Sequence, residues 1–269
     1  MQETPLVITV CQHPGIFSLS LYDIESSKCD GFVVVSDRTD LSIGAIHVPH
    51  EGPEEYGNRW QKIKSGWAFI YQNYYSRYDW FFLAQVDSFL IIENLRYYLE
   101  SDEIQMAENG GRIDAPGGTQ TPMYIGRRFA LAGLDSEIYN NNGPGYVLNK
   151  AALKTLVVDA FPQLDSTIFH ARSSSHDTFV ARAFRQVGVR PYPTQDEKGG
   201  ERFMPFLPRH HYEYRFPKDR SSDWYAKFSL PGVRVGMDHF AARSIGFHHA
   251  IGETMLKLYT LAYGMCADE

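Results

Sequence analysis

The stretch that most constrains the fold runs from Trp80 to Glu100 and reads WFFLAQVDSFLIIENLRYYLE. Its first part, Trp80–Val86, is largely apolar and does not alternate, which is typical of a strand buried on both faces of a sheet. One acid, Asp87, ends this run, and a buried carboxylate is costly unless something binds it. Two interpretations stay open here: a hydrogen-bonded structural aspartate, or a metal or ligand site at the carboxyl end of a central strand, where open α/β sheets bind ligands.

Strands and helices alternate on both sides of this stretch. Leu6–Cys11 and Gly31–Val35 resemble strands, with the weakly helical Ile16–Lys28 between them, and such a β-α-β start is typical of nucleotide-binding sheets. Apolar residues at helical spacing predict a helix over Trp60–Tyr75 that packs on the sheet. Further predicted elements are a strand at Ile43–Val48, a strand at Pro122–Phe129, a turn within Asn140–Leu148, helices within Lys150–Phe161, Ser173–Val189 and Glu253–Gly264, and a long loop over Thr194–His211. We therefore expect a single mixed α/β domain over residues 1–269.

Several polar or small residues follow predicted strands and are candidates for ligand binding. Asp37 could contact a ribose or a base, or could simply form a turn. Arg127 and Arg128 could face a diphosphate, or could be a solvated pair. Gly143 and Gly145 suggest either a close backbone approach or a plain turn. Neither the GxGxxG fingerprint nor the P-loop occurs in the sequence, so nucleotide binding by those motifs is excluded.

Two further segments carry titratable side chains. Asp177 comes at the start of a predicted amphipathic helix, where an acid favours the helix N-terminus or can act as a general base. His248 and His249 end the segment RSIGFHH, and adjacent residues of a strand point to opposite faces. At most one of the two histidines is therefore expected to enter a given site, with a structural histidine as the alternative.

The composition narrows the classes of partner. A net charge of −6 without a basic tract argues against nucleic acid as the main partner. No run approaches the roughly 20 apolar residues of a membrane span, and the N-terminus does not resemble a signal peptide.

Three cysteines are too few for a disulfide framework, although Cys11 and Cys29 could pair or could be buried thiols. The many aromatic side chains suit sugar stacking as well as core packing, and Trp224 and Tyr225 are candidates for either role. The oligomeric state stays open.

Several segments, taken in order, resemble the fringe and core 1 β1,3-galactosyltransferase family, and most of all its core 1 branch. They are WQKIKSGWAFIYQNYY, DWFFLAQVDSFLIIENLRYYL, PMYIGRRF, NNGPGYVLNKAAL, SSSHDTFVARAFRQVGV, GGERFMPFLPRHH and RSIGFHH. The resemblance extends from about residue 6 to about residue 264. It implies the Rossmann-like GT-A fold, a UDP-sugar donor, Mn²⁺, and inversion at the anomeric carbon.

The resemblance also implies roles for particular residues. The three acids of the family's metal motif match Gln85, Val86 and Asp87, so that only the last acid is kept. The family's metal-binding histidine matches His248. Because Gln85 offers a neutral oxygen where the family has a charge, we expect weaker metal binding, with Arg127 or Arg128 supplying part of the missing neutralisation.

The catalytic acid pair of the family matches His176 and Asp177, and the retained acid, Asp177, is the expected base. Cys11 and Cys29 match a family disulfide. If the family precedent holds for localisation, the protein works in the Golgi lumen with an anchor outside this sequence; otherwise it is cytoplasmic.

The predicted function is therefore transfer of a hexose, with galactose implied by the family, from a UDP-sugar to a sugar hydroxyl of a glycan or glycoprotein acceptor. The family resemblance implies a β linkage, with β1,3 as the expected position. The alternative is a catalytically inactive family member that acts as a chaperone or binding partner of a transferase, because WFFLA and IIENL also resemble such a relative. A metal hydrolase is disfavoured, since the histidines lack HExxH-type spacing.

Overall fold

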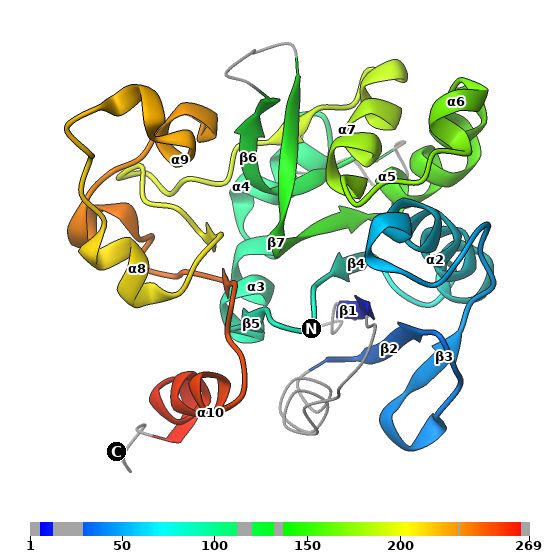
Figure 1. Ribbon diagram of the computed structural model, residues 1–269, viewed down its shortest axis with the longest axis horizontal. Coiled ribbons are helices and arrows are strands. Elements are labelled where there is room, and N and C mark those ends of the chain that lie inside the picture. Colours follow the sequence, from blue (N-terminus) through cyan, green and yellow to red (C-terminus); the bar gives the residue numbers. More distant parts are fainter. Residues whose placement is uncertain (1–5, 13–28, 112–119, 132–136, 231, 265–269) are drawn as a thin grey trace.

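The computed structural model describes residues 6–12 as backbone, together with residues 29–111, 120–131, 137–230 and 232–264. A seven-stranded sheet in the order β3-β2-β1-β4-β7-β6-β8 forms its centre (Figure 1). Its strands are β1 (Leu6–Gln12), β2 (Gly31–Ser36), β3 (Ala45–His47), β4 (Trp80–Leu83), β6 (Tyr124–Ala130), β7 (Ile138–Asn149) and β8 (Pro191–Tyr192). The predicted mixed α/β class is confirmed.

The strand directions bring several chain segments to one edge of this sheet. Strands β1, β2, β3 and β4 are parallel, so their carboxyl ends share that edge. Strand β7 runs antiparallel to β4, with Tyr146 opposite Leu83 and Asn149 opposite Trp80. The N-terminal half of β7 therefore reaches the same edge as the carboxyl end of β4.

A smaller sheet in the order β5-β10-β9 adjoins this edge. It consists of β5 (Phe89–Leu90), β9 (Phe203–Met204) and β10 (Gly246–Phe247). Phe247 pairs with Phe89 in antiparallel register. This register places the residues after β10 beside the residues before β5, which brings the histidine pair to Asp87.

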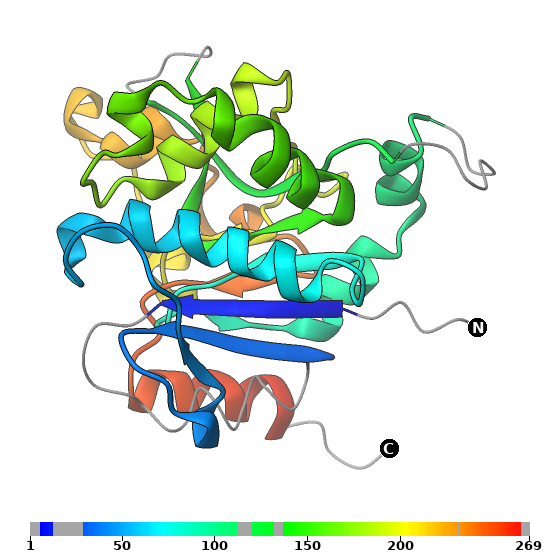
Figure 2. The same cartoon turned by 90° about the vertical axis from the view of Figure 1, so that its right-hand side faces the viewer.

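Helices cover both faces of the central sheet. One layer contains α2 (Arg59–Tyr74), α5 (Lys150–Lys154, continued by a π-type segment over Thr155–Ala160), α6 (Ser166–Phe169) and α7 (His176–Gln186). The other side carries α3 (Ile92–Leu99), α4 (Asp102–Glu108) and α10 (Glu253–Tyr259, continued over Thr260–Gly264), and two short helices, α8 (Pro208–Glu213) and α9 (Trp224–Phe228), lie beside the small sheet. Figure 2 shows α2 above β1 and α10 below β2. Short 3-10 turns lie at Leu41–Ile43, Tyr56–Asn58, Phe161–Gln163, Arg220–Ser222 and Gly236–His239.

Strand β4 is buried on both faces, as its unbroken apolar sequence predicts. Phe81 and Leu83 pack into the core under α2, α5 and α7, whereas Phe82 and Ala84 pack into the core formed with α3. The strand ends at Leu83, earlier than the predicted Val86. The chain turns at this point, because the Ser88 amide donates to the Gln85 carbonyl at 3.0 Å.

Two sequence-based assignments differ from the structure. The predicted turn within Asn140–Leu148 is part of the long strand β7. The pairing jumps from Gly126–Tyr146 to Arg127–Asn141, so residues 142–145 form a bulge that leaves the ladder. The predicted loop Thr194–His211 contains β9 and the beginning of α8. Ile16–Lys28 lies outside the described residues, and so does the Cys11 side chain. Among the described helices, none combines the length and the apolar sequence needed to cross a membrane.

Candidate active site

Asp87 lies in a tight turn between β4 and β5 that is fixed on two sides. The Gln85 amide donates to Ser88 Oγ at 3.1 Å, and Ser88 Oγ donates to the carbonyl of Gly143 in the β7 bulge at 2.7 Å. The Ala250 amide donates to the Asp87 carbonyl at 2.8 Å. The turn, the bulge and the segment after β10 are thus joined, and the position of Asp87 is set by the backbone around it.

The Asp87 carboxylate faces both histidines. His248 Nε2 lies 3.2 Å from Asp87 Oδ1, and His249 Nδ1 lies 3.6 Å from Asp87 Oδ2. Burial opposes ionisation of Asp87, but the hydrogen bond from His248 and the charges of the two histidines outweigh it and lower the pKa of Asp87. Burial lowers the pKa of His249, which favours the neutral imidazole that binds metals.

These three side chains fit a divalent cation. One ligand atom from each residue can be chosen so that all lie within 4.8 Å of one another. A carboxylate oxygen and two imidazole nitrogens suit a first-row divalent ion and leave coordination positions for substrate oxygens. The metal-ligand role predicted for Asp87 and His248 therefore has a third candidate, His249.

The expectation that only one histidine faces a given site is wrong. Strand β10 ends at Phe247, so the alternation of strand side chains does not extend through the pair. His249 adopts a positive φ of 66°, which is unusual for a residue other than glycine. The two imidazole rings lie 3.8 Å apart between centroids and both reach Asp87. A strained backbone at this point is typical of a functional site.

The two glycines of the β7 bulge have different neighbours. A Cβ at Gly143 would lie 2.5 Å from His248 Nδ1, so the glycine permits the bulge to approach the histidine. Gly145 has a φ of 82°, and its Cβ would lie 2.4 Å from Phe82 Cζ and 2.5 Å from the Leu83 carbonyl oxygen. Close approach at both positions is confirmed, but Gly145 packs on β4. Donor binding by the two glycines stays a prediction.

Asp177 lies in the first turn of α7, and its carboxylate accepts the amide of Thr178 at 2.9 Å. The Asn142 amide, from the β7 bulge, also hydrogen-bonds this carboxylate and thereby connects it to the segment that carries Gly143. Burial raises the pKa of Asp177 to about 6 despite these hydrogen bonds. Such a carboxylate is ionised at neutral pH and more basic than an ordinary aspartate, which suits a general base.

His176 precedes Asp177 but is not a second acid–base group. It is buried, and its Nδ1 lies 3.0 Å from the Ser174 carbonyl oxygen. Burial lowers the pKa of His176 to about 3, so the imidazole is neutral.

Arg59, which the sequence reasoning missed, also belongs to this region. It is the first residue of α2, and its Nη2 donates to Gln85 Oε1 at 2.6 Å. The two residues are far apart in the sequence, so no local pattern links them. The only signal in the sequence is a cation at the start of the helix that precedes β4.

The arginine pair on β6 lies in a different environment. Arg127 is fully buried and forms an ion pair with Glu201, which is also buried. Arg128 is half-buried, and its Nη2 lies 3.4 Å from Gln195 Oε1. The predicted diphosphate contact is therefore corrected for Arg127, because its charge is already neutralised in the interior. For Arg128 the contact stays a prediction.

Asp37 is exposed at the carboxyl end of β2, on the same edge of the sheet as Asp87. Ser36 Oγ donates to its carboxylate at 3.1 Å, and this hydrogen bond is the main cause of a lowered pKa of Asp37. Its predicted contact with a nucleoside remains compatible with this place.

Aromatic side chains extend from the histidine pair. The Phe206 ring stacks on His249 with a centroid distance of 6.0 Å, and Trp224 packs edge-on against Phe206 at 6.0 Å. Trp224 is 52% exposed, whereas Tyr225 is buried and its hydroxyl lies 2.9 Å from His239 Nε2. Of the two aromatic candidates, Trp224 is therefore free to contact a ligand and Tyr225 fills the core.

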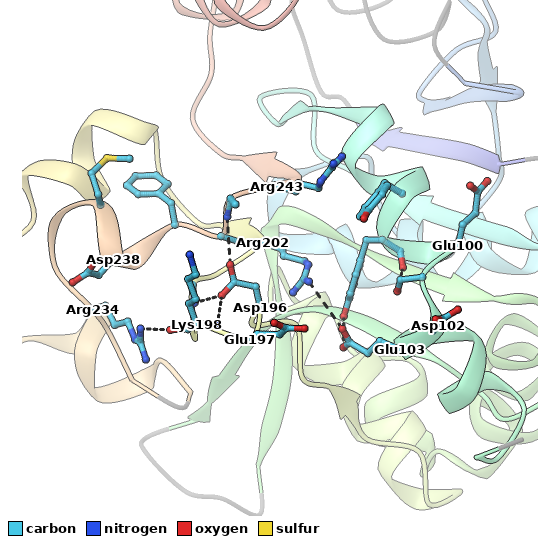
Figure 3. Close-up of a pocket in the computed structure, with 18 residues that line it drawn as sticks. Glu100, Asp102, Glu103, Asp196, Glu197, Lys198, Arg202, Arg234, Asp238 and Arg243 are labelled. Carbon is cyan, nitrogen blue, oxygen red and sulfur yellow. Dashed lines mark hydrogen bonds and ion pairs between the residues drawn. The ribbon is translucent and has the colours of Figure 1, made fainter. Parts of the chain in front are cut away.

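A pocket of about 860 Å³ lies between α3, α4 and the loops around residues 196–202 and 234–243 (Figure 3). None of the predicted site residues lines it. Three of its charged side chains bond within the protein: Arg202 pairs with Glu103, and Asp196 accepts the Lys198 and Gly200 amides. The pocket is thus separate from the Asp87 cluster, and local structure accounts for these charges.

Comparison with known proteins agrees with the resemblance seen in the sequence. No protein-family model matches the chain. The chain is 26% identical, over 236 residues, to glycoprotein-N-acetylgalactosamine 3-beta-galactosyltransferase 1 of Xenopus laevis. The match covers 87% of this chain and 58% of the relative, so the chain spans less than two thirds of that protein's length.

One solved structure also aligns with this chain. It is a glycosyltransferase involved in the glycosylation of the major capsid of PBCV-1. The alignment has a TM-score of 0.33 and 12% identity, and it covers 70% of this chain and 80% of that structure's chain. The sequence likeness to the Xenopus enzyme confirms the resemblance to the core 1 branch and supports a glycosyltransferase.

Proposed function

We propose that the chain is an inverting glycosyltransferase domain of the GT-A type. It moves galactose from UDP-galactose to a sugar hydroxyl of a glycan or glycoprotein acceptor and forms a β1,3 linkage. The observation that carries this proposal is the connection of Asp177 to the Asp87–His248–His249 cluster through the β7 bulge. The likeness to the Xenopus galactosyltransferase supports the donor, the linkage and the class of acceptor.

Asp87, His248 and His249 would hold a divalent cation, for which Mn²⁺ is the family-implied choice. When bound, such a cation would supply positive charge that stabilises a diphosphate leaving group. Asp37, exposed at the carboxyl end of β2 on the same edge of the sheet as Asp87, contacts the nucleoside in this proposal. The fixed turn around Asp87 keeps its carboxylate in place without a bound substrate, which reduces the reorganisation needed during the reaction.

Asp177 takes the proton of the acceptor hydroxyl. The acceptor oxygen forms a bond to the anomeric carbon, the bond from that carbon to the UDP oxygen breaks, and its electron pair leaves with UDP. A pKa of about 6 keeps Asp177 ionised above that pH. Attack from the face opposite UDP gives the β product. Trp224, exposed beside Phe206, stacks on the acceptor ring.

The experiment is to incubate the protein with UDP-galactose or UDP-glucose and a galactosamine-containing acceptor, with Mn²⁺ or with EDTA, and to measure UDP release. We expect Mn²⁺-dependent release from UDP-galactose that falls as the pH drops below about 6, because Asp177 is then protonated. Asp177→Asn should abolish release and leave UDP binding unchanged. Asp219→Asn, an exposed aspartate in another loop, is the matched control.

A non-catalytic chaperone is the second candidate, and Gln85 is the observation that favours it, since an acid of the family's metal motif is missing there. Measuring UDP release and UDP binding distinguishes the two candidate functions. A chaperone binds a transferase without turning over any donor, so the absence of UDP release and of calorimetric UDP binding would replace the enzyme proposal with this one.

A further inference from the structure

The place of Arg59 is set by a buried framework. It opens α2, directly before Trp60, whose backbone amide donates to the Ser173 carbonyl at 2.9 Å and whose Nε1 donates to the Ile168 carbonyl at 2.8 Å. Trp60 is fully buried. The helix start is therefore anchored to the loop before α7, and the half-buried Arg59 side chain projects from a rigid support.

The contacts of the Arg59 guanidinium orient it beside the metal cluster. Its Nη2 donates to Gln85 Oε1 at 2.6 Å, and Cζ lies 5.0 Å from the centroid of the Tyr56 ring. Gln85 belongs to the turn that holds Asp87. This hydrogen bond to the neutral Gln85 amide fixes the direction of the guanidinium.

The same positive charge acts on the base. Arg59 is one of the groups that lower the pKa of Asp177, and it also contributes to the low pKa of His176. The guanidinium is therefore within electrostatic reach of Asp177 while it is hydrogen-bonded to the Asp87 turn. A sugar donor with its anomeric carbon near Asp177 and its diphosphate near Asp87 would extend alongside Arg59.

We propose that Arg59 is a donor-binding residue that contacts the diphosphate of the UDP-sugar and carries part of the positive charge required when UDP leaves. This inference rests on the proposed function. The fork of guanidinium N–H groups matches two phosphate oxygens at once. Arg59 thus supplies the compensation for Gln85 that Arg127 cannot supply, since Arg127 is ion-paired with Glu201 in the interior.

The first test is calorimetry of UDP and of uridine, each with Mn²⁺ and with EDTA. Arg59→Gln should weaken UDP binding about tenfold to a hundredfold, the size of a lost charge-assisted hydrogen bond, and leave uridine binding unchanged. The loss should persist in EDTA, because the contact does not pass through the metal. Arg77→Gln is the matched control: Arg77 follows the other end of α2 and also stacks on a tyrosine, Tyr74, at 5.7 Å. It should bind UDP like the wild type.

Substitutions that keep or cancel the charge provide a second test. Gln85→Asp should weaken UDP binding in EDTA, because the new carboxylate competes with the diphosphate for Arg59, and should recover affinity with Mn²⁺, because it adds a metal ligand. Arg59→Lys keeps the charge without the fork and should fall between wild type and Arg59→Gln. This variant and Gln85→Asp keep the proposal testable if Arg59→Gln does not fold, as judged by circular dichroism.

The outcomes separate the two proposals. Wild-type protein that binds no UDP under any condition overturns the proposed function together with this inference. Wild-type protein that binds UDP, with Arg59→Gln folded and equally tight, overturns the inference alone. An equal loss of uridine and UDP binding also overturns it, since the effect is then not on the diphosphate.

Discussion

Gly143 lies against the imidazole ring of His248, so closely that a Cβ at position 143 would stand 2.5 Å from Nδ1 and 2.9 Å from Cγ. Protein atoms do not pack at such distances. The glycine therefore sets how near the β7 bulge can come to the histidine. It couples the segment that hydrogen-bonds Asp177 to a candidate metal ligand.

Gly143→Ala should consequently push the His248 ring away from Asp87. We expect Mn²⁺ affinity to fall about tenfold to a hundredfold, the usual cost of disturbing the groups that orient a metal ligand. Calorimetric titration with Mn²⁺ measures this. Gly57→Ala is the control, because its Cβ meets only Glu55 Oε1 at an ordinary 3.6 Å. Equal Mn²⁺ affinity of wild type and Gly143→Ala would show that His248 is not held by this contact.

His249→Ala should weaken Mn²⁺ binding by at least about tenfold, since loss of a ligand should cost no less than loss of a supporting group. His249 Nδ1 is 3.6 Å from Asp87 Oδ2, within the cluster that could bind the ion. The matched variant is His210→Ala, because the exposed His210 also stacks on Phe206, at 4.3 Å, and is not part of the cluster. If both variants bind Mn²⁺ alike, His249 only packs against Phe206.

Asp177→Asn should stabilise the fold at neutral pH. Burial raises the pKa of Asp177 from the ordinary value of 3.8 to about 6, so the folded state holds the proton more tightly than the unfolded chain. Its contribution to stability is fully present below about pH 4 and is lost as the pH rises through 6. The neutral asparagine avoids this loss, and we expect a gain of about 3 kcal/mol at pH 7.5.

Urea unfolding of the two proteins at pH 4 and at pH 7.5 measures this difference, which should be near zero at the lower pH. Asp219→Asn is a comparison of opposite sign. Hydrogen bonds from Ser221 lower the pKa of Asp219, so this substitution should lower, and not raise, the stability of the fold at pH 7.5. A pH-independent difference for Asp177→Asn would mean that Asp177 has an ordinary pKa.

The fold of the central sheet was largely predictable, for a physical reason. A strand buried on both faces needs an unbroken apolar run, and Trp80–Leu83 has one. The end of this strand was misplaced because the turn at residues 85–88 depends on a hydrogen bond from Ser88 to Gly143, a distant partner. The bulge in β7 escaped prediction for a similar reason, since Asn-Gly-Pro-Gly resembles a turn when read without its neighbouring strands.

The site was only partly predictable, because its parts meet through tertiary structure. Asp87 and Asp177 could be singled out by position and by family resemblance. His249 could not, because its role depends on a strand that ends one residue before the histidine pair and on a positive φ. Arg59 meets Gln85 across 26 positions, and Arg127 pairs in the interior with Glu201, a residue of the segment predicted as a long loop.

That inward-facing ion pair gives the final prediction, which concerns stability. Arg127 and Glu201 are both almost completely buried, and Glu201 also accepts a hydrogen bond from Gln195. Removing one member of a buried pair leaves the other charge uncompensated, which typically costs about 3 to 5 kcal/mol. Glu201→Gln should therefore lower the free energy of unfolding by about that amount in urea titrations at pH 7.5.

The exposed neighbour Glu197 is the control, and Glu197→Gln should change stability by less than about 0.5 kcal/mol. The double variant Arg127→Met/Glu201→Leu should recover much of the loss, because it removes both charges; a double variant less stable than Glu201→Gln would show that packing, and not the uncompensated charge, dominates.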